Sequence, residues 1–272
     1  MMRSFFTEYI HKITEYLKSI LFIIYIHIMK AEVSKLEIIK VNNVSKYYKQ
    51  LRALNNVSLS INDGELYGLL GVNGAGKTTL LKILSGLTKM SSGEFIVSGF
   101  NQNQMDEIKR IIDISPQETA VAKNLTVLEN LKFFQDLYDK KDDEYLNQII
   151  NDLGLSDVVK QRAKTLSGGY QRRLSIALGL ISKPKILLLD EPTLGLDVLA
   201  RRDLWKIINK FKGKITIILT SHYLEEIEAL CDRVAIMSKG DLLIEGTIDE
   251  IKEKTNETSF EEAFVKIVGG ID

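Results

Sequence analysis

The sequence predicts an α/β protein with a mainly parallel sheet core, an N-terminal antiparallel β subdomain and an inserted α-helical subdomain. Residues 186–189 and 215–219 are continuous apolar runs, as expected of strands that are buried on both faces of a parallel sheet. Residues 36–44 and 57–61 alternate in part between apolar and polar side chains and are separated by a polar stretch, which indicates an antiparallel sheet. Residues 118–165 are mostly helical in the spacing of their apolar side chains.

The remaining elements follow in chain order. Residues 66–70 form an apolar run that predicts a buried strand leading directly into a glycine-rich loop. Residues 77–87 carry apolar side chains at helical spacing, so the loop is predicted to open a helix. Residues 234–237 and 242–244 are separated by a short turn segment and predict a hairpin near the end of the chain.

Helix ends are marked by capping residues. Thr126 with Glu129 has the spacing of a capping box, in which each residue satisfies a free backbone amide of the first turn. Gly154 stands where a helix is expected to end, because glycine readily adopts the left-handed conformation found there. Ser259 with Glu262 predicts the start of a last amphipathic helix.

Composition limits the class of protein. The 272 residues suffice for one large α/β domain or two small ones, and 45% apolar with 26% charged residues is ordinary for a globular chain. Basic and acidic residues number 36 each, and this balance argues against a general nucleic-acid binder. The single cysteine, Cys231, excludes an internal disulfide and indicates a reducing compartment. We interpret Cys231 as a small core residue rather than a nucleophile.

Residues 1–34 differ from the rest of the chain. Apolar side chains fall at helical spacing, and residues 20–29 are almost wholly apolar, but this run is shorter than the roughly 20 residues that span a bilayer. Residues 27–30 offer no small side chains for signal-peptide cleavage. Two interpretations stay open: an amphipathic helix on a membrane or a partner, or a start-site artefact with the true start at Met29. We therefore divide the chain into an extension (1–34), a main domain (35–247) and a helical tail (248–272).

The glycine-rich loop has the pattern of a phosphate-binding loop. Several backbone N–H groups can converge on a triphosphate only where side chains do not obstruct them, and the following helix points its positive N-terminus at the anion. A lysine at the end of the loop would reach the β and γ phosphates, and the next hydroxyl would coordinate Mg²⁺. The predicted ATP-binding residues of this P-loop nucleoside triphosphatase segment are Gly71, Val72, Asn73, Gly74, Ala75, Gly76, Lys77, Thr78 and Thr79.

Two acidic residues end the apolar run at 186–189. Asp190 lies at the end of the predicted strand, where a carboxylate next to the phosphate loop can hold Mg²⁺ directly or through water. Glu191 follows, and could polarise the attacking water as a general base. Two acidic residues after an apolar run are weak evidence for a catalytic site when taken alone. Together with a phosphate-binding loop in the same chain, they indicate a site for Mg²⁺ and for hydrolysis.

A third motif lies between the first two. The segment Thr165-Leu166-Ser167-Gly168-Gly169-Tyr170-Gln171-Arg172 opens a predicted helix, and its serine hydroxyl, glycine amides and helix dipole offer a second anion site. With this segment, the sequence resembles the ATP-binding subunits of ABC transporters over roughly residues 36–269, in which it is the signature motif. The resemblance implies that Ser167, Gly168, Gly169 and Tyr170 bind the γ-phosphate held by the other subunit of a head-to-tail dimer.

Further positions match that family one by one. Tyr48 stands where the family places an aromatic ring that stacks on adenine, and Gln117 where it places a glutamine that senses Mg²⁺ and the attacking water. Asp197 matches the loop that crosses the dimer interface, and His222 the histidine that contacts the γ-phosphate. The resemblance thus implies Glu191, His222 and Gln117 as catalytic residues, and Thr78, Gln117 and Asp190 as the magnesium site.

One departure from the family is visible, and the tail carries a second resemblance. Tyr170 occupies the position where the commonest signature has glutamine, while the serine and glycines are intact, so we expect activity to survive.

Residues 259–264 look like the C-terminal helix of the branch that includes drug, antibiotic-resistance and sodium exporters. Export rather than import is therefore the expected direction.

The resemblance implies the following function. Two such subunits, identical or homologous, sandwich ATP and Mg²⁺, and their closure drives a separate polytopic membrane permease from the cytoplasmic face of the cell membrane. Residues 118–165 are the expected docking surface for that permease. The alternative is a soluble ABC ATPase that acts on a non-membrane partner. A DNA-repair ATPase would place a long coiled coil between the two motifs, and a P-loop kinase would need neither the signature nor Asp197.

Overall fold

The computed structural model describes residues 36–139 and 141–270, so the predicted extension at 1–34 lies outside the described residues. The strands are β1 (Glu37–Tyr48), β2 (Leu51–Asn62), β3 (Leu66–Leu70), β4 (Ser92–Val97), β5 (Phe100–Asn101), β6 (Ile112–Ser115), β7 (Ile186–Asp190), β8 (Thr216–Ser221), β9 (Arg233–Ser238) and β10 (Asp241–Gly246). The helices are α2 (Lys77–Leu84), α3 (Met105–Lys109), α4 (Val127–Leu137), α5 (Asp143–Asp152), α6 (Gly168–Ile181), α7 (Val198–Asn209), α8 (Leu224–Leu230), α9 (Ile248–Thr255) and α10 (Phe260–Gly269), with short 3₁₀ turns η1 (Ser156–Val158) and η2 (Ala163–Thr165).

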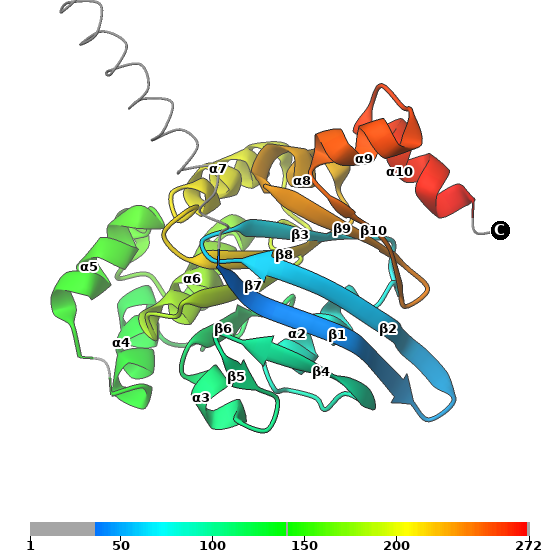
Figure 1. Ribbon diagram of the computed structural model, residues 1–272. Helices are drawn as coiled ribbons and strands as arrows, with labels where there is room; N and C mark the ends of the chain where they lie inside the picture. The colour runs from blue at the N-terminus through cyan, green and yellow to red at the C-terminus, as the bar shows by residue number, and fades with distance from the viewer. Residues whose placement is uncertain (1–35, 140, 271–272) are drawn as a thin grey trace, which may run out of the picture. The chain divides into compact units, whose positions relative to one another are not determined.

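The described strands form two sheets (Figure 1). The larger has the order β10-β9-β3-β8-β7-β6, in which all neighbours are parallel except the β9–β10 hairpin at one edge. The smaller is antiparallel and has the order β2-β1-β4-β5. This arrangement confirms the predicted mainly parallel core with an antiparallel N-terminal part.

The parallel strands are buried on both faces. In β3, Leu66 and Leu70 belong to one hydrophobic core, which contains side chains of α4 to α8 and of the last two helices. Tyr67 and Leu69, which point to the opposite face, belong to a second core that contains side chains of β1, β2, β4 and α2. Successive side chains of a strand alternate between faces. A continuous apolar run is therefore required where both faces are covered, as the sequence predicted.

The β1–β2 hairpin is longer than predicted. The sequence indicated strands at 36–44 and 57–61 with a polar stretch between them, but β1 and β2 pair as far as the turn, with several register shifts along the way. The polar side chains satisfy one another across the hairpin: Ser45 Oγ donates to Asn56 Oδ1 (2.9 Å) and accepts the Asn56 N–H (2.9 Å). The prediction of strand length was wrong because polarity was taken as a sign of a loop, whereas paired polar groups tolerate a strand.

The helix after the glycine loop is shorter than the predicted 77–87. It ends at Leu84, and Gly86 adopts φ 72°, a left-handed conformation that ends the helix. The Leu87 N–H donates to the carbonyl oxygen of Lys82 (2.9 Å), which closes the last turn. Apolar spacing alone could not place this end.

The region 118–165 is only partly helical. It contains α4, α5 and the two 3₁₀ turns, whereas residues 118–126 are irregular. The buried Asn130 side chain fixes this irregular segment: it accepts the Ala122 N–H (2.8 Å) and donates to the carbonyl oxygens of Ala122 (3.1 Å) and Thr126 (2.9 Å). These tertiary contacts replace the hydrogen bonds that a helix would have made.

The predicted caps are present. Thr126 and Glu129 form the capping box at the start of α4, and Gly154, with φ 61°, follows the end of α5. Ser259 precedes α10, where its Oγ accepts the Glu262 N–H (3.2 Å). The hairpin near the end of the chain is also confirmed as β9 and β10, joined by a two-residue turn.

The last two helices pack on the same core as the sheet. Ile251 of α9, together with Phe260 and Ala263 of α10, is fully buried in the core that covers one face of the parallel strands. The predicted boundary between a main domain and a helical tail at residues 247 and 248 stays a prediction.

Within the described ranges, no helix is long and apolar enough to cross a membrane. Cys231 is a free thiol that packs against this core, and burial raises its pKa.

Candidate functional site

The glycine loop lies between β3 and α2, and its glycines are required by the backbone path. A Cβ at Gly71 would collide with the carbonyl oxygen of Met237, and one at Gly76 would lie 2.7 Å from the carbonyl oxygen of Ala53. Gly74 (φ 83°) and Gly76 (φ 102°) have left-handed backbone conformations. Side chains are therefore excluded where the loop turns, which leaves its backbone N–H groups accessible to an anion.

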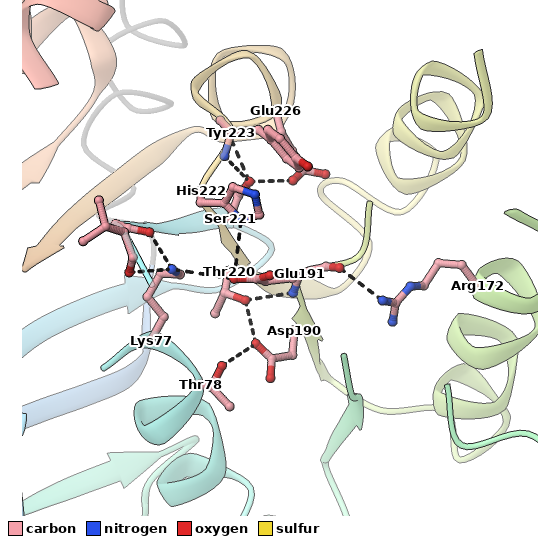
Figure 2. A network of polar contacts seen from close by, with 12 residues as sticks. Lys77, Thr78, Arg172, Asp190, Glu191, Thr220, Ser221, His222, Tyr223 and Glu226 are labelled. Carbon is pink, nitrogen blue, oxygen red and sulfur yellow. Dashed lines mark hydrogen bonds and ion pairs between the residues drawn. The ribbon is translucent and has the colours of Figure 1, made fainter. Parts of the chain in front are cut away.

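Lys77 is the first residue of α2 and is 5% exposed. Its Nζ donates to the carbonyl oxygens of Gly71 (2.5 Å) and Val72 (3.3 Å), and lies 3.7 Å from Glu191 Oε1 (Figure 2). Burial lowers the pKa of Lys77, and the charges of Glu191 and Asp190 oppose that shift. The ammonium group is thus held at the loop by short contacts that a phosphate oxygen could replace.

A hydroxyl and carboxylate cluster lies below the loop, where two parallel strands end side by side. Asp190, the last residue of β7, pairs in register with Thr220 of β8. Asp190 Oδ1 accepts hydrogen bonds from Thr78 Oγ1 (2.9 Å) and Thr220 Oγ1 (2.7 Å), as Figure 2 shows. The sequence did not identify Thr220. Its hydroxyl position relative to Asp190 depends on strand register, which the sequence leaves open.

The donor set fits Mg²⁺ held together with a nucleotide. Among the described residues, no group of three or more His, Cys, Asp or Glu side chains could hold a metal ion by itself. Mg²⁺ is usually bound by one or two protein oxygens, substrate phosphates and water. The Thr78 hydroxyl and the buried Asp190 carboxylate, in direct contact, supply that small number of hard oxygen ligands.

Glu191 has an unusual backbone. Its φ of 47° is left-handed, and its N–H donates to Thr220 Oγ1 (2.8 Å). Its carboxylate Oε1 lies 3.7 Å from Lys77 Nζ and 3.6 Å from His222 Nδ1. A non-glycine residue in this conformation is strained and persists where its surroundings fix it, commonly at functional sites. The Glu191 carboxylate thus lies between the lysine and the histidine.

Arg172 is buried beside the site, and the sequence analysis did not identify it as a site residue. It lies on α6, and its guanidinium donates to the carbonyl oxygens of Pro116 (2.7 Å), Gln117 (2.9 Å) and Glu191 (3.1 Å). Burial lowers the pKa of Arg172, and the nearby acidic charges oppose the shift. One side chain therefore joins the signature helix to the backbone of both Gln117 and Glu191. The sequence signal was weak, because a second arginine, Arg173, follows directly, and only the structure shows that Arg172 is the buried one.

A cavity of about 520 Å³ lies at the site, and Asp190, Thr220 and Arg172 stand behind its wall rather than in it. The predicted Tyr48, Gln117, Glu191 and His222 line it together with most of the glycine loop, and Tyr48 is 43% exposed at its wall. Four residues that the sequence did not single out complete the wall. The lining residues are Tyr48, Leu51, Arg52, Ala53, Asn73, Gly74, Ala75, Gly76, Lys77, Thr78, Thr79, Gln117, Glu191, Leu194 and His222.

The signature residues lie elsewhere. Ser167 is exposed and caps α6, where its Oγ accepts the Tyr170 N–H (3.5 Å). Asp197 caps α7 in the same way by accepting the Ala200 N–H (2.9 Å). Of the residues described, none from the signature segment lines the cavity. A Cβ at Gly168 would lie 3.7 Å from Leu196 Cδ2, so the two helix starts are neighbours.

The fold and the site define a P-loop nucleoside triphosphatase. The family described as "ABC transporter" matches residues 54–194. The chain belongs to this family and is an ATP-binding cassette ATPase.

Known relatives agree with this assignment. The linearmycin resistance ATP-binding protein LnrL of Bacillus subtilis is 36% identical over 214 residues, covering 77% of this chain and 69% of LnrL. The doxorubicin resistance ATP-binding protein DrrA of Mycobacterium tuberculosis is 37% identical over 225 residues, covering 80% of this chain and 68% of DrrA. The human phospholipid-transporting ATPase ABCA3 is 39% identical over 79% of this chain, but the match spans only 13% of that longer protein.

Solved structures share the fold. The ATP-binding subunit of an ABC transporter superposes with a TM-score of 0.76 at 27% identity, covering 85% of this chain and 99% of that one. A dimeric ATP-binding cassette in a post-hydrolysis state, bound to ADP and Pi, has a TM-score of 0.68 at 27% identity, covering 77% and 98%.

Proposed function

We propose that this chain energises export through a separate polytopic permease by ATP-driven head-to-tail dimerisation at the cytoplasmic face of the cell membrane. The observation that carries the proposal is the position of the signature. The exposed Ser167 lies outside the cavity that the phosphate loop forms, so it is free to complete the cavity of a second subunit. That subunit is another copy or a homologue. The resistance ATP-binding proteins among the relatives support the exporter class.

The glycine loop binds the phosphates of ATP. Its amides and the start of α2 provide converging N–H donors, and Lys77 exchanges its contacts with Gly71 and Val72 for the β and γ phosphates. Tyr48 stacks on the adenine at the wall of the cavity. Thr78, Asp190 and Gln117 hold the Mg²⁺ that neutralises the phosphate charge.

Glu191 acts as the general base. Its carboxylate accepts a proton from the attacking water, and the strained backbone together with the Arg172 contact fixes the carboxylate position. His222, whose Nδ1 lies 3.6 Å from Glu191 Oε1, contacts the γ-phosphate. In the closed dimer, the partner's signature supplies donors to the same γ-phosphate through its serine hydroxyl and helix N-terminus. Because ADP lacks the γ-phosphate, hydrolysis removes these contacts and allows the dimer to open.

The permease docks on the helical region. On α4, Phe133 is 55% exposed and Leu137 65% exposed, and Tyr138 follows directly at the helix end. Large apolar side chains gathered on one exposed helix are typical of a protein-binding surface. The same region connects to the site, since α4 packs against α6, which carries both the signature and Arg172.

Copurification from mildly solubilised membranes tests the transporter proposal. We expect the tagged chain to recover a stoichiometric polytopic membrane protein, and the double variant Phe133→Glu with Leu137→Glu to lose it while keeping its ATPase activity. Val265→Glu is the matched control, because Val265 is 62% exposed on α10, a different part of the structure. Recovery only from the cytosol with a non-membrane partner would contradict export and favour a soluble ABC ATPase.

A further inference from the structure

A carboxylate that the mechanism does not use lies buried behind His222. Glu226 of α8 is 1% exposed. Its Oε2 accepts a hydrogen bond from Ser221 Oγ (2.7 Å), and its Oε1 accepts one from Trp205 Nε1 (3.1 Å). Burial raises the pKa of Glu226, and its hydrogen bonds and the charge of Arg201 oppose that shift. A buried carboxylate is costly unless hydrogen bonds or an opposite charge compensate it, and Ser221, Trp205 and Arg201 supply both.

Ser221 connects Glu226 to the segment that carries His222. Ser221 Oγ accepts the Tyr223 N–H (2.9 Å), so one hydroxyl fixes the backbone on both sides of the histidine (Figure 2). The Ser221 carbonyl oxygen accepts the N–H of Gly71 (3.3 Å), the first residue of the phosphate loop. The hydrogen bonds of Ser221 therefore fix the backbone position of His222, and Glu226 in turn fixes the Ser221 side chain.

Trp205 connects Glu226 to α7. The N-cap of this helix is Asp197, the residue predicted to cross the dimer interface. A second link runs in parallel, because the Arg201 guanidinium lies 4.2 Å from the centre of the Tyr223 ring. The Tyr223 ring in turn lies 4.1 Å from the His222 ring. Two independent contacts thus join α7 to the histidine segment.

We propose that Glu226 is a positioning residue that acts in two directions. Through its hydrogen bond with Ser221 it fixes the position of His222, and through its hydrogen bond with Trp205 it couples the position of His222 to α7 and to the N-cap residue Asp197. The proposal rests on the proposed function, since the coupling matters where α7 meets a second subunit. A contact of His222 with the γ-phosphate is transmitted along this path to the interface loop. When phosphate is released, the loss of that contact is transmitted along the same residues to the interface loop.

The single tryptophan makes the path measurable. Trp205 is the only tryptophan of the chain, so its emission reports the hydrogen bond to Glu226 without labelling. We expect the emission to differ between the ATP-bound and the ADP-bound chain. In Glu226→Gln, this difference is lost and kcat falls about tenfold, because a displaced catalytic group costs rate. The Kd for ATP stays within about threefold, since the phosphate loop is untouched.

Glu225→Gln is the matched control. Glu225 neighbours Glu226 on α8 but is exposed, so the same chemical change there is expected to preserve emission and rate. Ser221→Ala breaks the path at its other end and gives a second variant if Glu226→Gln folds poorly. We expect the losses in Glu226→Gln and Ser221→Ala to be strongly non-additive in the double variant, because both remove one connection.

Two readouts separate the outcomes. Unchanged tryptophan emission between ATP and ADP in the wild type, or retained nucleotide-dependent emission in Glu226→Gln, overturns the coupling even if the chain hydrolyses ATP and dimerises. Additive losses in the double variant overturn it as well. If the wild type fails to dimerise yet its emission distinguishes ATP from ADP and that of Glu226→Gln does not, the coupling stands and the proposed dimer fails.

Discussion

Replacing Lys77 with alanine is expected to reduce ATP hydrolysis by at least about 100-fold, the loss typical when one donor to a transition-state charge is removed. The Lys77 ammonium is the buried cation at the phosphate loop, within 3.7 Å of Glu191. Its removal takes away the proposed contact with the β and γ phosphates and leaves the Glu191 carboxylate without its neighbouring charge. A steady-state phosphate-release assay together with an ATP-binding titration measures both effects.

Lys82→Ala is the control for this variant. Lys82 lies on the same helix but is exposed, and its alanine variant is expected to hydrolyse ATP at the wild-type rate. Thermal denaturation of both variants checks that each is folded. Ordinary turnover in Lys77→Ala would show that the glycine loop is not the catalytic phosphate site.

Replacing Glu191 with glutamine is expected to lower kcat by at least about 100-fold, because general-base catalysis commonly contributes that much. Glutamine keeps the size of the side chain but cannot accept the proton of the attacking water. ATP binding remains, since the glycine loop and Tyr48 are unchanged. ATP therefore accumulates unhydrolysed, and the variant is expected to form a dimer that sedimentation or gel filtration detects.

The control for the second variant is Glu228→Gln on α8, where the carboxylate is exposed. It is expected to hydrolyse ATP normally and to form no lasting dimer. A monomer of Glu191→Gln at saturating ATP would contradict the sandwich arrangement, while a normal rate would exclude Glu191 as the base.

The parts of the fold that the sequence predicted are those set by local pattern. The strands of the parallel sheet are continuous apolar runs because both faces are covered, and this requirement is visible residue by residue. The glycine loop is visible because its backbone path excludes side chains at Gly71 and Gly76. Order along the chain then placed the two acids at the end of β7 and the histidine after β8.

The parts that the sequence did not predict depend on contacts between distant residues. The polar half of the first hairpin forms because Ser45 and Asn56 satisfy each other. The irregular segment before α4 is held by Asn130, a single side chain with several backbone partners. Glu226 and Arg172 are charged residues within helices, and only the packed structure shows that they are buried near the site. The roles of the predicted site residues stay predictions.

A mixing experiment tests most directly the central claim that each ATP is enclosed by two subunits. Ser167→Arg blocks the exposed signature but leaves that chain's own phosphate loop and Glu191 intact. Glu191→Gln leaves the signature intact but removes the proposed general base. Each variant alone is expected to be nearly inactive, because neither homodimer contains a complete site.

Mixed in equal amounts before ATP is added, the two variants form heterodimers with one complete site. The Glu191 of the Ser167→Arg chain then faces the intact signature of the Glu191→Gln chain. The account predicts that ATPase activity, measured as phosphate release, returns in the mixture well above the sum of the separate variants. A mixture no more active than that sum, with both variants folded and able to bind ATP, would contradict the head-to-tail composite site.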